Sequence, residues 1–274
     1  MSVEVTRIRP TRGWQLVDLR EIWHYRDLLY FLTIRGIKAK YAQSVLGVGW
    51  AIIQPLFQTL VFTVIFGNLA KMSSDGVPYV LFSFTAMVPW NYFSNILTDS
   101  SSSLIQNRDM LSKVYFPRLV LPVSAVIAKL LDFLIAFTVL GGLLLYYGFL
   151  PTTNLIFFPL LLLILMMASL GTGMILSALA VQYRDVQYAM SFLVRILLYS
   201  VPVVYSISII PEEYVYLYAL NPMVGVIEGM RSVFLGTHAM PWDLIAIGGG
   251  VALFLFVFGA FYFRRMEKTF ADIA

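Results

Sequence analysis

Long apolar segments alternate with short polar ones along this chain of 274 residues. A helix that crosses a membrane needs about 20 mostly apolar residues. Six windows meet this requirement if broken or tilted helices are allowed: about 46–67, 79–98, 119–147, 155–181, 188–209 and 242–263. The pattern therefore predicts an all-α polytopic membrane protein with a single six-helix transmembrane domain over residues 46–264.

The composition also indicates a membrane protein. Hydrophobic residues make up 59% of the chain and the mean hydropathy is +0.81, whereas soluble domains are about 45–50% apolar. A chain of this size cannot hide so much apolar surface in its own core, so lipid must cover much of it. The first apolar window begins near Leu46, too far along for a secretory signal, and we expect the N-terminal segment to be retained. The absence of cysteine excludes disulfides and thiolate metal sites.

The positive charges are distributed unevenly among the connections. Fifteen lysines and arginines lie before Val45, in the connections after the second and fourth windows, or in the tail, whereas the other three connections hold only Lys71 and Arg231. The positive-inside rule then places both termini in the cytoplasm. Residues 1–45 become a cytoplasmic N-terminal segment and residues 265–274 a short cytoplasmic tail. The basic pI of 9.2 reflects this topology, and we expect no nucleic-acid partner.

Residues 21–40, ahead of the first window, predict a basic amphipathic helix. Its apolar stripe consists of Ile22, Tyr25, Leu29 and Leu32, with Leu28 beside it. A helix of this kind lies in the membrane interface. It either anchors the first span at its depth or docks a partner.

A polar insert separates the second and third windows, and residues 101–119 read SSSLIQNRDMLSKVYFPRL. Its charged side chains are Arg108, Asp109, Lys113 and Arg118. Leu104, Leu111 and the VYF sequence at 114–116 can form an apolar side, and Pro117 ends any helix before the third span. A short amphipathic helix on the cytoplasmic face is suited to lie in the groove of a soluble subunit. The alternative is a plain interfacial linker.

Polar residues also occur inside the predicted spans. Gln54 and Gln58 are four apart on the first span and share one helical face. Amides in a membrane face protein or water, because an unpaired polar group in hydrocarbon costs several kcal/mol. The two glutamines therefore either bond to another helix or line a pore. In the second span, Pro89 predicts a kink or a break.

Two further patterns inside the spans predict packing rather than chemistry. Lys129 and Asp132 are three apart on the third span and can pair with each other. A structural pair is favoured over a proton relay, because both histidines lie outside the spans. Ser169, Gly173 and Ser177 form a small-residue ladder on the fourth span that lets another helix approach closely.

The outer connection, residues 206–241, is long and only half polar. Pro211 and Pro222 are well placed as helix starts, which predicts two short re-entrant helices. Glu228 and Arg231 are three apart and can neutralise each other there. A cluster of tyrosines lies at the same depth: Tyr199, Tyr205, Tyr214, Tyr216 and Tyr218. They form either an ordinary interfacial aromatic belt or a stacking surface for sugar rings.

Several catalytic signatures are missing from the sequence. There is no G-x-x-x-x-G-K-[ST] phosphate loop, no H-E-x-x-H and no G-x-S-x-G. The chain therefore cannot hydrolyse a nucleotide, and it must use energy supplied by something else, or none. We expect neither a metal nor a cofactor in this chain, and no enzymatic activity of its own.

Three segments in a fixed order carry a resemblance to a known family. They are QNRDMLSKVYFPRLVLP after the second span, QYRDV after the fourth, and LNPMVGVIEGMR before the sixth. With the interfacial N-terminal helix and the six spans, the chain resembles the membrane subunit of type-2 ABC exporters for polysaccharides. The resemblance implies a homodimer, joined by two copies of a separate subunit that binds ATP and Mg²⁺. Such a complex exports lipid-linked O-antigen, capsule or teichoic acid polymer across the bacterial inner membrane.

The resemblance also implies roles for particular residues. The gate and coupling element after the second span would comprise Gln106, Asn107, Arg108, Asp109, Lys113, Tyr115 and Phe116. Candidates to line the conduit, on the two spans that the family places around it, are Gln54, Gln58, Tyr199 and Tyr205. The outer gate helices over residues 211–235 would use Tyr214, Tyr218, Asn221, Glu228 and Arg231.

Two other classes compete with the exporter hypothesis. A secondary transporter or channel predicts inverted repeats or a chain of ionisable groups at mid-membrane, and no convincing repeat is present. A membrane enzyme, such as a lipid-linked glycosyl or acyl transferase, needs acids or histidines near one interface. The outer connection does hold Glu212, Glu213, Glu228 and His238.

Overall fold

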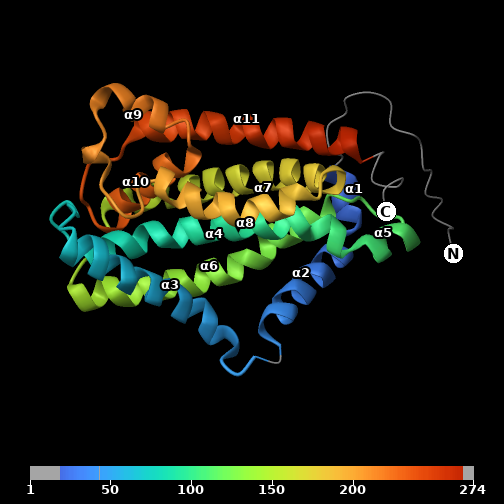
Figure 1. Cartoon of the computed structure of the whole chain (residues 1–274), viewed down its shortest axis with the longest axis horizontal. Helices are drawn as coiled ribbons and strands as arrows, with labels where there is room; N and C mark the ends of the chain where they lie inside the picture. Colours follow the sequence, from blue (N-terminus) through green and yellow to red (C-terminus); the bar gives the residue numbers. More distant parts are fainter. Residues whose placement is uncertain (1–18, 43, 268–274) are drawn as a thin grey trace.

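In the computed structural model, which describes residues 19–42 and 44–267, every regular element is a helix. The longest helices run side by side along the longest axis of the molecule (Figure 1). They are α4 (Tyr79–Gln106), α6 (Val120–Tyr147), α7 (Phe158–Gln182) and α11 (Trp242–Met266). The others are α1 (Leu19–His24), α2 (Arg26–Tyr41), α3 (Trp50–Phe62), α5 (Arg108–Lys113), α8 (Asp185–Leu197), α9 (Glu212–Tyr218) and α10 (Pro222–Phe234). The all-α prediction is confirmed for the described residues.

Four helical stretches of the described residues are long and apolar enough to cross a membrane. They are Gly47–Leu69, Val120–Tyr147, Thr153–Gln182 and Trp242–Met266. The first joins α3 to a 3-10 turn before it and to a π-helical turn, Thr63–Leu69, after it. The first, third, fourth and sixth predicted windows thus correspond to candidate spans, and the second and fifth are not among the four.

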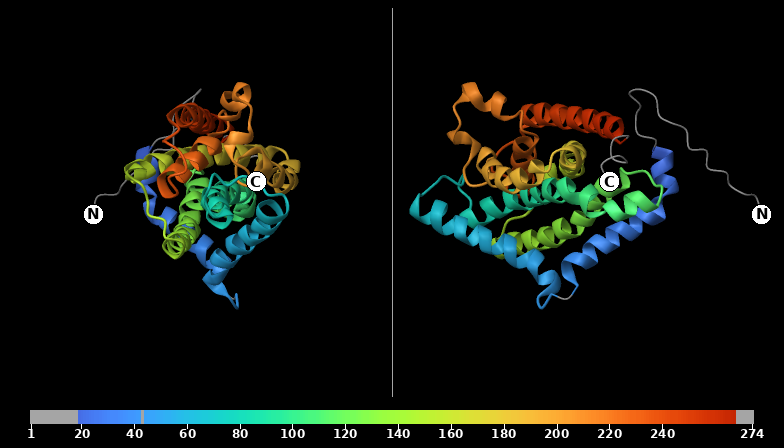
Figure 2. Two further views of the ribbon diagram at one scale, coloured as in Figure 1. Left: turned by 90° about the vertical axis from the view of Figure 1, so that its left-hand side faces the viewer. Right: turned by 45° about the vertical axis from the view of Figure 1, so that its right-hand side comes forward.

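The second window belongs to α4, a helix of 28 residues at the centre of the bundle (Figure 2). It packs against α3, α6, α7, α8 and α10, and most of its residues are buried. A helix enclosed by protein needs no apolar surface for lipid, so α4 can carry the serines, threonines and asparagines that lower its hydropathy. The helix continues through Pro89, so a break at this proline is a wrong prediction. Neighbouring helices enclose that position and can satisfy the backbone group that the proline leaves free.

The fifth window is helical only over its first half. α8 has 13 residues and ends in a 3-10 turn at Leu198–Ser200, after which Val201 is extended, with φ −127° and ψ 152°. The cause is local, because Pro202 disfavours a helical conformation in the residue before it. α8 is therefore too short to cross a membrane as a regular helix.

A second, smaller core lies beside the main one and holds α2 on the bundle. Leu32, Leu104 and Phe116 are buried in it, with residues of α6, α7 and α11 around them. The predicted apolar stripe of the N-terminal helix packs here through Ile22, Tyr25, Leu28, Leu29 and Leu32. The stripe is confirmed, but it covers protein, and the helix is divided into α1 and α2 at Tyr25.

Small residues set the closest helix contacts, as the ladder on the fourth span predicted. A Cβ added at Gly173 of α7 would lie 2.8 Å from Ser100 Oγ of α4. A Cβ added at Gly259 of α11 would lie 2.5 Å from the carbonyl oxygen of Gly171 on α7. Such distances leave no room for a methyl group, so the backbone of α7 lies directly against the backbone of α11 and against the small Ser100 side chain of α4.

The two ends of the bundle differ in what they carry. α1, α5 and the last turn of α11 gather at one end, which we call the α5 end (Figures 1 and 2). There Tyr115 donates a hydrogen bond to Glu21 at 3.2 Å, and Arg264 lies 3.8 Å from the same carboxylate. The opposite end, with α9, is called the α9 end.

Candidate functional site

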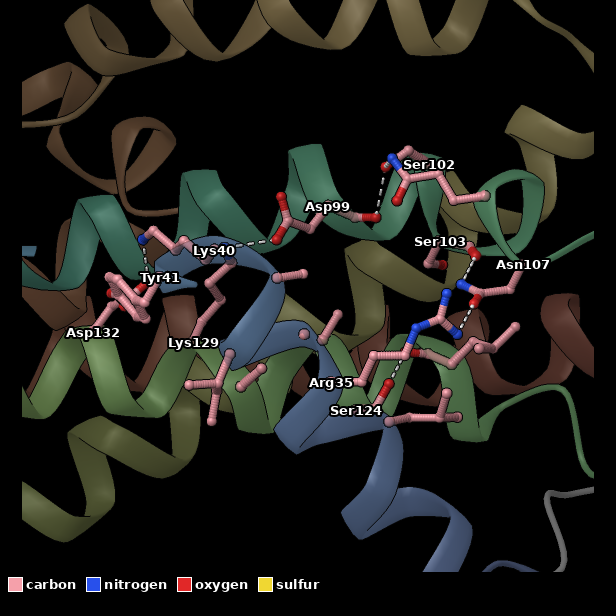
Figure 3. A pocket seen from close by; sticks show the side chains of 18 residues that line it. Arg35, Lys40, Tyr41, Asp99, Ser102, Ser103, Asn107, Ser124, Lys129 and Asp132 are labelled. Carbon is pink, nitrogen blue, oxygen red and sulfur yellow. Dashed lines mark hydrogen bonds and ion pairs between the residues drawn. The ribbon is translucent and has the colours of Figure 1, made fainter. Parts of the chain in front are cut away.

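Two cavities lie where α2 and α3 pack on α4 and α6. The α2 cavity has a volume of about 280 Å³ and is lined by α2, α4 and α6 (Figure 3). The α3 cavity has a volume of about 700 Å³ and is lined by α3, α4 and α6, with Lys40 from α2. Lys40, Lys129 and Asp132 line both cavities. The two cavities therefore meet at these three side chains.

Two ion pairs join the helices at this meeting point. Lys40 Nζ of α2 lies 2.6 Å from Asp132 Oδ2 of α6. Lys129 Nζ of α6 lies 2.6 Å from Asp99 Oδ2 of α4. Tyr41 donates a hydrogen bond to Asp132. Burial of the Tyr41 hydroxyl is the main cause that raises its pKa, and the bond to Asp132 raises it further, so the phenol stays protonated.

The predicted pairing of Lys129 with Asp132 along one helix is therefore wrong. Each of the two side chains reaches a partner on a different helix instead. Because the Lys40 side chain is 33% exposed and that of Asp99 46%, water screens both bridges, and each contributes roughly 0.2–1 kcal/mol. The two bridges thus tie α2 to α6 and α6 to α4.

The α3 cavity contains four side-chain amides. Gln54 and Gln58 come from α3, and Asn91 and Asn95 come from α4. Within the described residues, none of these four side chains has a hydrogen-bond partner. Hydrogen bonding of the glutamines to another helix of the same chain is therefore not observed among the described residues. Both glutamines line the α3 cavity, and their role in a pore stays a prediction.

The asparagines belong to a polar stripe on α4 that the sequence reasoning missed. The stripe consists of Asn91, Asn95, Asp99, Ser102 and Gln106. Its members are spaced by three or four residues and so lie on one helical face. The first two line the α3 cavity and the last three line the α2 cavity. This spacing of three or four residues was the signal available in the sequence.

The two conduit tyrosines lie away from the amides, because neither lines the α3 cavity. The Tyr205 hydroxyl donates to the backbone oxygen of Tyr199 at 3.0 Å and contacts the Tyr218 hydroxyl of α9. The Tyr199 side chain is exposed. The structure thus separates the four conduit candidates into two places and joins the tyrosine pair to the outer gate set.

The outer gate set divides between an exposed helix and a buried one. Tyr214 on α9 is exposed, whereas every residue of α10 is buried. Asn221 caps α10 by accepting a hydrogen bond from the backbone N–H of Met223 at 3.1 Å. Glu228 and Arg231 pair at 2.7 Å, as their spacing predicted.

The Arg231 guanidinium has further partners in the core. It lies over the ring of Phe82 on α4, 3.4 Å from the centroid. It also donates to the backbone oxygen of Val203 at 3.3 Å. The arginine therefore connects α10 to α4 and to the segment that follows α8.

The predicted coupling insert, residues 101–119, does not form a single short helix between the spans. This corrects the extent of the predicted helix. Its first residues continue α4 to Gln106, and α5 follows after Asn107. Asn107 donates to the backbone oxygen of Ser103 at 2.8 Å and accepts from Arg35 at 3.2 Å, which fixes the bend.

Three charged residues of the insert are exposed, Arg118 is half-buried, and one aromatic residue anchors the insert. Arg108, Asp109 and Lys113 are exposed. Phe116 is only 4% exposed and packs in the smaller core. No group of three or more metal-binding side chains is found among the described residues. The buried Phe116 thus fixes the insert on the bundle, and the exposed charged side chains lie at the α5 end.

Comparison with known proteins adds to this geometry. The family model for the ABC-2 type transporter matches residues 27–235. The chain is 32% identical over 254 residues to the O-antigen export system permease protein RfbA of Myxococcus xanthus, covering 91% of this chain and 96% of that protein. It is 29% identical to the RfbA protein of Klebsiella pneumoniae, covering 90% and 95%. It is 25% identical to the polysialic acid transport protein KpsM of Escherichia coli, covering 87% and 93%.

Proposed function

The chain belongs to the ABC-2 type transporter family, and we propose that it is the transmembrane subunit of an ATP-driven exporter of lipid-linked polysaccharide. The observation that carries this proposal is similarity along nearly the whole chain to permeases for O-antigen and for polysialic acid. Similarity of this extent favours an exporter subunit over a secondary transporter or a lipid-linked transferase. The exporter acts in the bacterial inner membrane.

In this proposal the membrane is crossed six times. Besides the four apolar stretches, α4 crosses as a helix enclosed by protein, and α8 crosses together with the irregular segment 201–206. Non-helical backbone at membrane depth is tolerated where protein covers it, and Val201, Val203 and Val204 are fully or almost fully buried. The α5 end then faces the cytoplasm, in line with the distribution of lysine and arginine.

A separate ATP-hydrolysing subunit supplies the energy, because this chain lacks a phosphate loop. Two copies of that subunit bind ATP and Mg²⁺, and α5 with the exposed Val114 and Tyr115 forms the docking surface. Exposed charge beside exposed apolar side chains suits the groove of a soluble partner.

The test reverses two charges on α5. The variant Arg108→Glu/Lys113→Glu should lose most of the ATPase subunit on co-purification while its level in the membrane is unchanged. Lys71→Glu makes the same kind of change at the exposed α9 end and should retain the partner. Full recovery of the ATPase subunit, together with normal stimulation of its ATP hydrolysis, would refute the docking role.

The proposed functional unit contains two copies of this chain. Among the residues of α8 only Met190 is buried, and large apolar side chains on it are exposed, including Tyr188, Phe192 and Ile196. A second copy that covers this face would create a seam wide enough for a polymer. A monomeric mass in mild detergent, combined with export by the same preparation, would contradict the dimer.

The polymer passes along α3 and α8, where Gln54, Gln58, Tyr199 and Tyr205 remain the predicted lining. Their contacts must be weak and repeated, because a tight site would stall a moving polymer. The variant Tyr199→Ala/Tyr205→Ala should slow export and leave assembly with the ATPase subunit intact. If thermal stability falls in proportion to export, the two tyrosines serve helix packing instead.

A further inference from the structure

The wall of the α2 cavity holds one more positive than negative side chain. Its charged residues are Arg35 and Lys40 of α2, Lys129 and Asp132 of α6, and Asp99 of α4. Each lysine lies 2.6 Å from one of the two carboxylates. Arg35 instead donates to the uncharged side chain of Asn107 at 3.2 Å, and among the described residues it forms no ion pair. One positive charge of the cavity therefore has no counter-ion within the described chain.

This charge lies at the end of the cavity that is nearest to α5. Arg35 and Asn107 lie at one end of the cavity, whereas Lys40, Tyr41 and Asp132 lie at the other (Figure 3). Asn107 immediately precedes α5, so the proposed topology places Arg35 close to the cytoplasmic face. Anionic lipids give the cytoplasmic leaflet a negative surface, and basic pockets between membrane helices on this side bind their headgroups.

The hydrogen-bonding groups of the wall suit a ligand that accepts. The hydroxyls of Ser103 and Ser124 donate to backbone oxygens of their own helices at 2.8 and 2.7 Å, and the Asn107 amide donates to the backbone oxygen of Ser103 at 2.8 Å. These neutral donors are occupied. A guanidinium has five N–H donors and an ammonium has three, so the three cations of the cavity keep most of theirs. Several charged donors around one space favour a phosphate group.

The size of the cavity and its rim fit a lipid headgroup. The volume of about 280 Å³ is several times the roughly 30 Å³ that a water molecule occupies in the liquid, so a headgroup fits and a whole lipid does not. On α6, Ile127 follows the cavity-lining Ser124 by three residues and Leu134 follows Ile127 by seven, so all three share one side of the helix. Ile127 and Leu134 are exposed. They lie farther from the α5 end than Ser124, which is the direction in which acyl chains extend into the membrane.

The net charge of the site distinguishes between kinds of lipid. The phosphodiester of phosphatidylglycerol carries one negative charge, which equals the excess positive charge of the wall. Phosphatidylcholine carries the same phosphate together with a quaternary ammonium group, so its net charge is zero and its cation would lie beside the cations of the cavity. The site therefore favours an anionic lipid over a zwitterionic one.

We propose that the α2 cavity binds the phosphate of an anionic phospholipid from the cytoplasmic leaflet, with Arg35 as its counter-ion and Lys40 and Lys129 as further donors. The lipid is a resident ligand that holds α2 on α4 and α6, and it is not transported. The inference uses the proposed topology and not the identity of the exported polymer. A failure of polysaccharide export would therefore leave it unaffected.

The first experiment measures lipid binding by the heat-induced unfolding of the full chain in detergent micelles. Phosphatidylglycerol at about 100 times its dissociation constant should raise the unfolding midpoint by roughly 5–10 °C, because a ligand that binds only the native state stabilises it by mass action. Phosphatidylcholine at the same content should raise the midpoint far less. An equal rise with phosphatidylcholine overturns the preference for an anionic lipid, and an equal rise with inorganic phosphate overturns the assignment to a lipid.

The second experiment removes the charge that has no counter-ion. Arg35→Gln should weaken the binding of phosphatidylglycerol by roughly 10-fold or more, because a hydrogen bond between charged groups contributes at least such a factor. The matched control is Lys38→Gln, which removes the same charge from an exposed position of α2 outside the cavity, and it should bind as the wild type does. An equal loss in both variants would show a general attraction of α2 to an anionic surface and would overturn the proposed site.

A third variant supplies the counter-ion from the protein itself. Asn107→Asp places a carboxylate where Arg35 already donates, at 3.2 Å, and leaves the guanidinium in the chain. It should weaken the binding of phosphatidylglycerol as strongly as Arg35→Gln does, although no cation has been removed. This variant keeps the test decisive if Arg35→Gln does not fold, and unchanged affinity in Asn107→Asp refutes the proposal.

The last measurement identifies the lipid that the protein retains from the cell. The chain is extracted in mild detergent from cells that make no polymer, which excludes the lipid-linked polymer as the source of the phosphate. Native mass spectrometry should show a bound anionic phospholipid on the wild type and on Lys38→Gln, and it should show little on Asn107→Asp. Retention of zwitterionic lipid alone, or of equal anionic lipid on all three proteins, contradicts a site in the α2 cavity.

Discussion

The buried pair Glu228–Arg231 offers the sharpest test of how the α9 end is held together. The side chains are 4% and 0% exposed, and their charged groups lie 2.7 Å apart. Arg231 also contacts the Phe82 ring and the Val203 carbonyl, so it connects three segments of the chain. Replacing either partner by methionine keeps most of the volume but leaves the other charge without its counter-ion.

The expected loss follows from the burial of both groups. Removing one member of a buried ion pair costs about 3–5 kcal/mol, because the remaining charge has been taken out of water. For a protein of this size each 1 kcal/mol corresponds to roughly 2–4 °C in the unfolding midpoint. Glu228→Met and Arg231→Met should each lower the midpoint by roughly 6–20 °C. Glu228→Met should be the more damaging, because a guanidinium cannot lose its proton whereas a lone carboxylate can gain one.

The double variant Glu228→Met/Arg231→Met decides whether the cost arises from the orphaned charge. Replacement of a whole buried pair by apolar residues of similar volume is often close to neutral. The double variant should therefore be more stable than either single one, as measured by the heat-induced unfolding midpoint in one detergent at one scan rate. Glu213→Met, on the exposed face of α9, should change the free energy of unfolding by no more than about 0.5 kcal/mol. The reasoning is refuted if the two single losses simply add in the double variant.

Three further changes have expected outcomes, two of them measured by the unfolding midpoint and one by hydrogen exchange. Gly259→Ala places a methyl group 2.5 Å from the Gly171 backbone and should lower the free energy of unfolding by about 1–3 kcal/mol. The control Gly250→Ala adds a methyl group with nothing within 4 Å, and it should leave the unfolding midpoint unchanged or raise stability by up to about 1 kcal/mol. Asn221→Ala removes the cap of α10 and should cost about 1 kcal/mol; an unchanged midpoint would contradict the capping role. Asp132→Asn removes the carboxylate that pairs with Lys40 and accepts a hydrogen bond from Tyr41, both of α2. Because α2 is then held less firmly on α6, amide hydrogen exchange in α2 should accelerate while that in α11 stays the same.

The parts of the fold that the sequence predicted well depend only on the residues of a single helix, through its hydropathy or its helical period. Only about a third of the residues in the third, fourth and sixth spans are buried inside the protein, so apolar residues continue around these helices and their mean hydropathy identifies them directly. The stripe through Ile22 and Leu32 and the spacing of Glu228 and Arg231 also depend only on the helical period, and the structure confirms both.

The parts that sequence reasoning missed depend on which helices become neighbours. Asp99 and Lys129 are far apart in the chain, and they pair because α4 and α6 lie side by side. Lys40 reaches Asp132 because α2 folds back onto α6 rather than lying free in the lipid interface. A pattern within one helix contains no information about such partners, so it favoured the nearest opposite charge, three residues away.

The place of α4 at the centre of the bundle explains why its polar stripe was the hardest feature to predict. One side of the helix, with Phe82 and Ile96 fully buried, forms the main core. The other side carries the stripe from Asn91 to Gln106 and lines two cavities. The mean hydropathy mixes these two faces, so α4 is not among the four apolar stretches although residues 79–98 were predicted as a span. A polar path through a bilayer needs a wall that lipid does not touch, and a helix enclosed by five others provides such a wall. The polar face of α4 is thus tolerated because other helices and two cavities surround it.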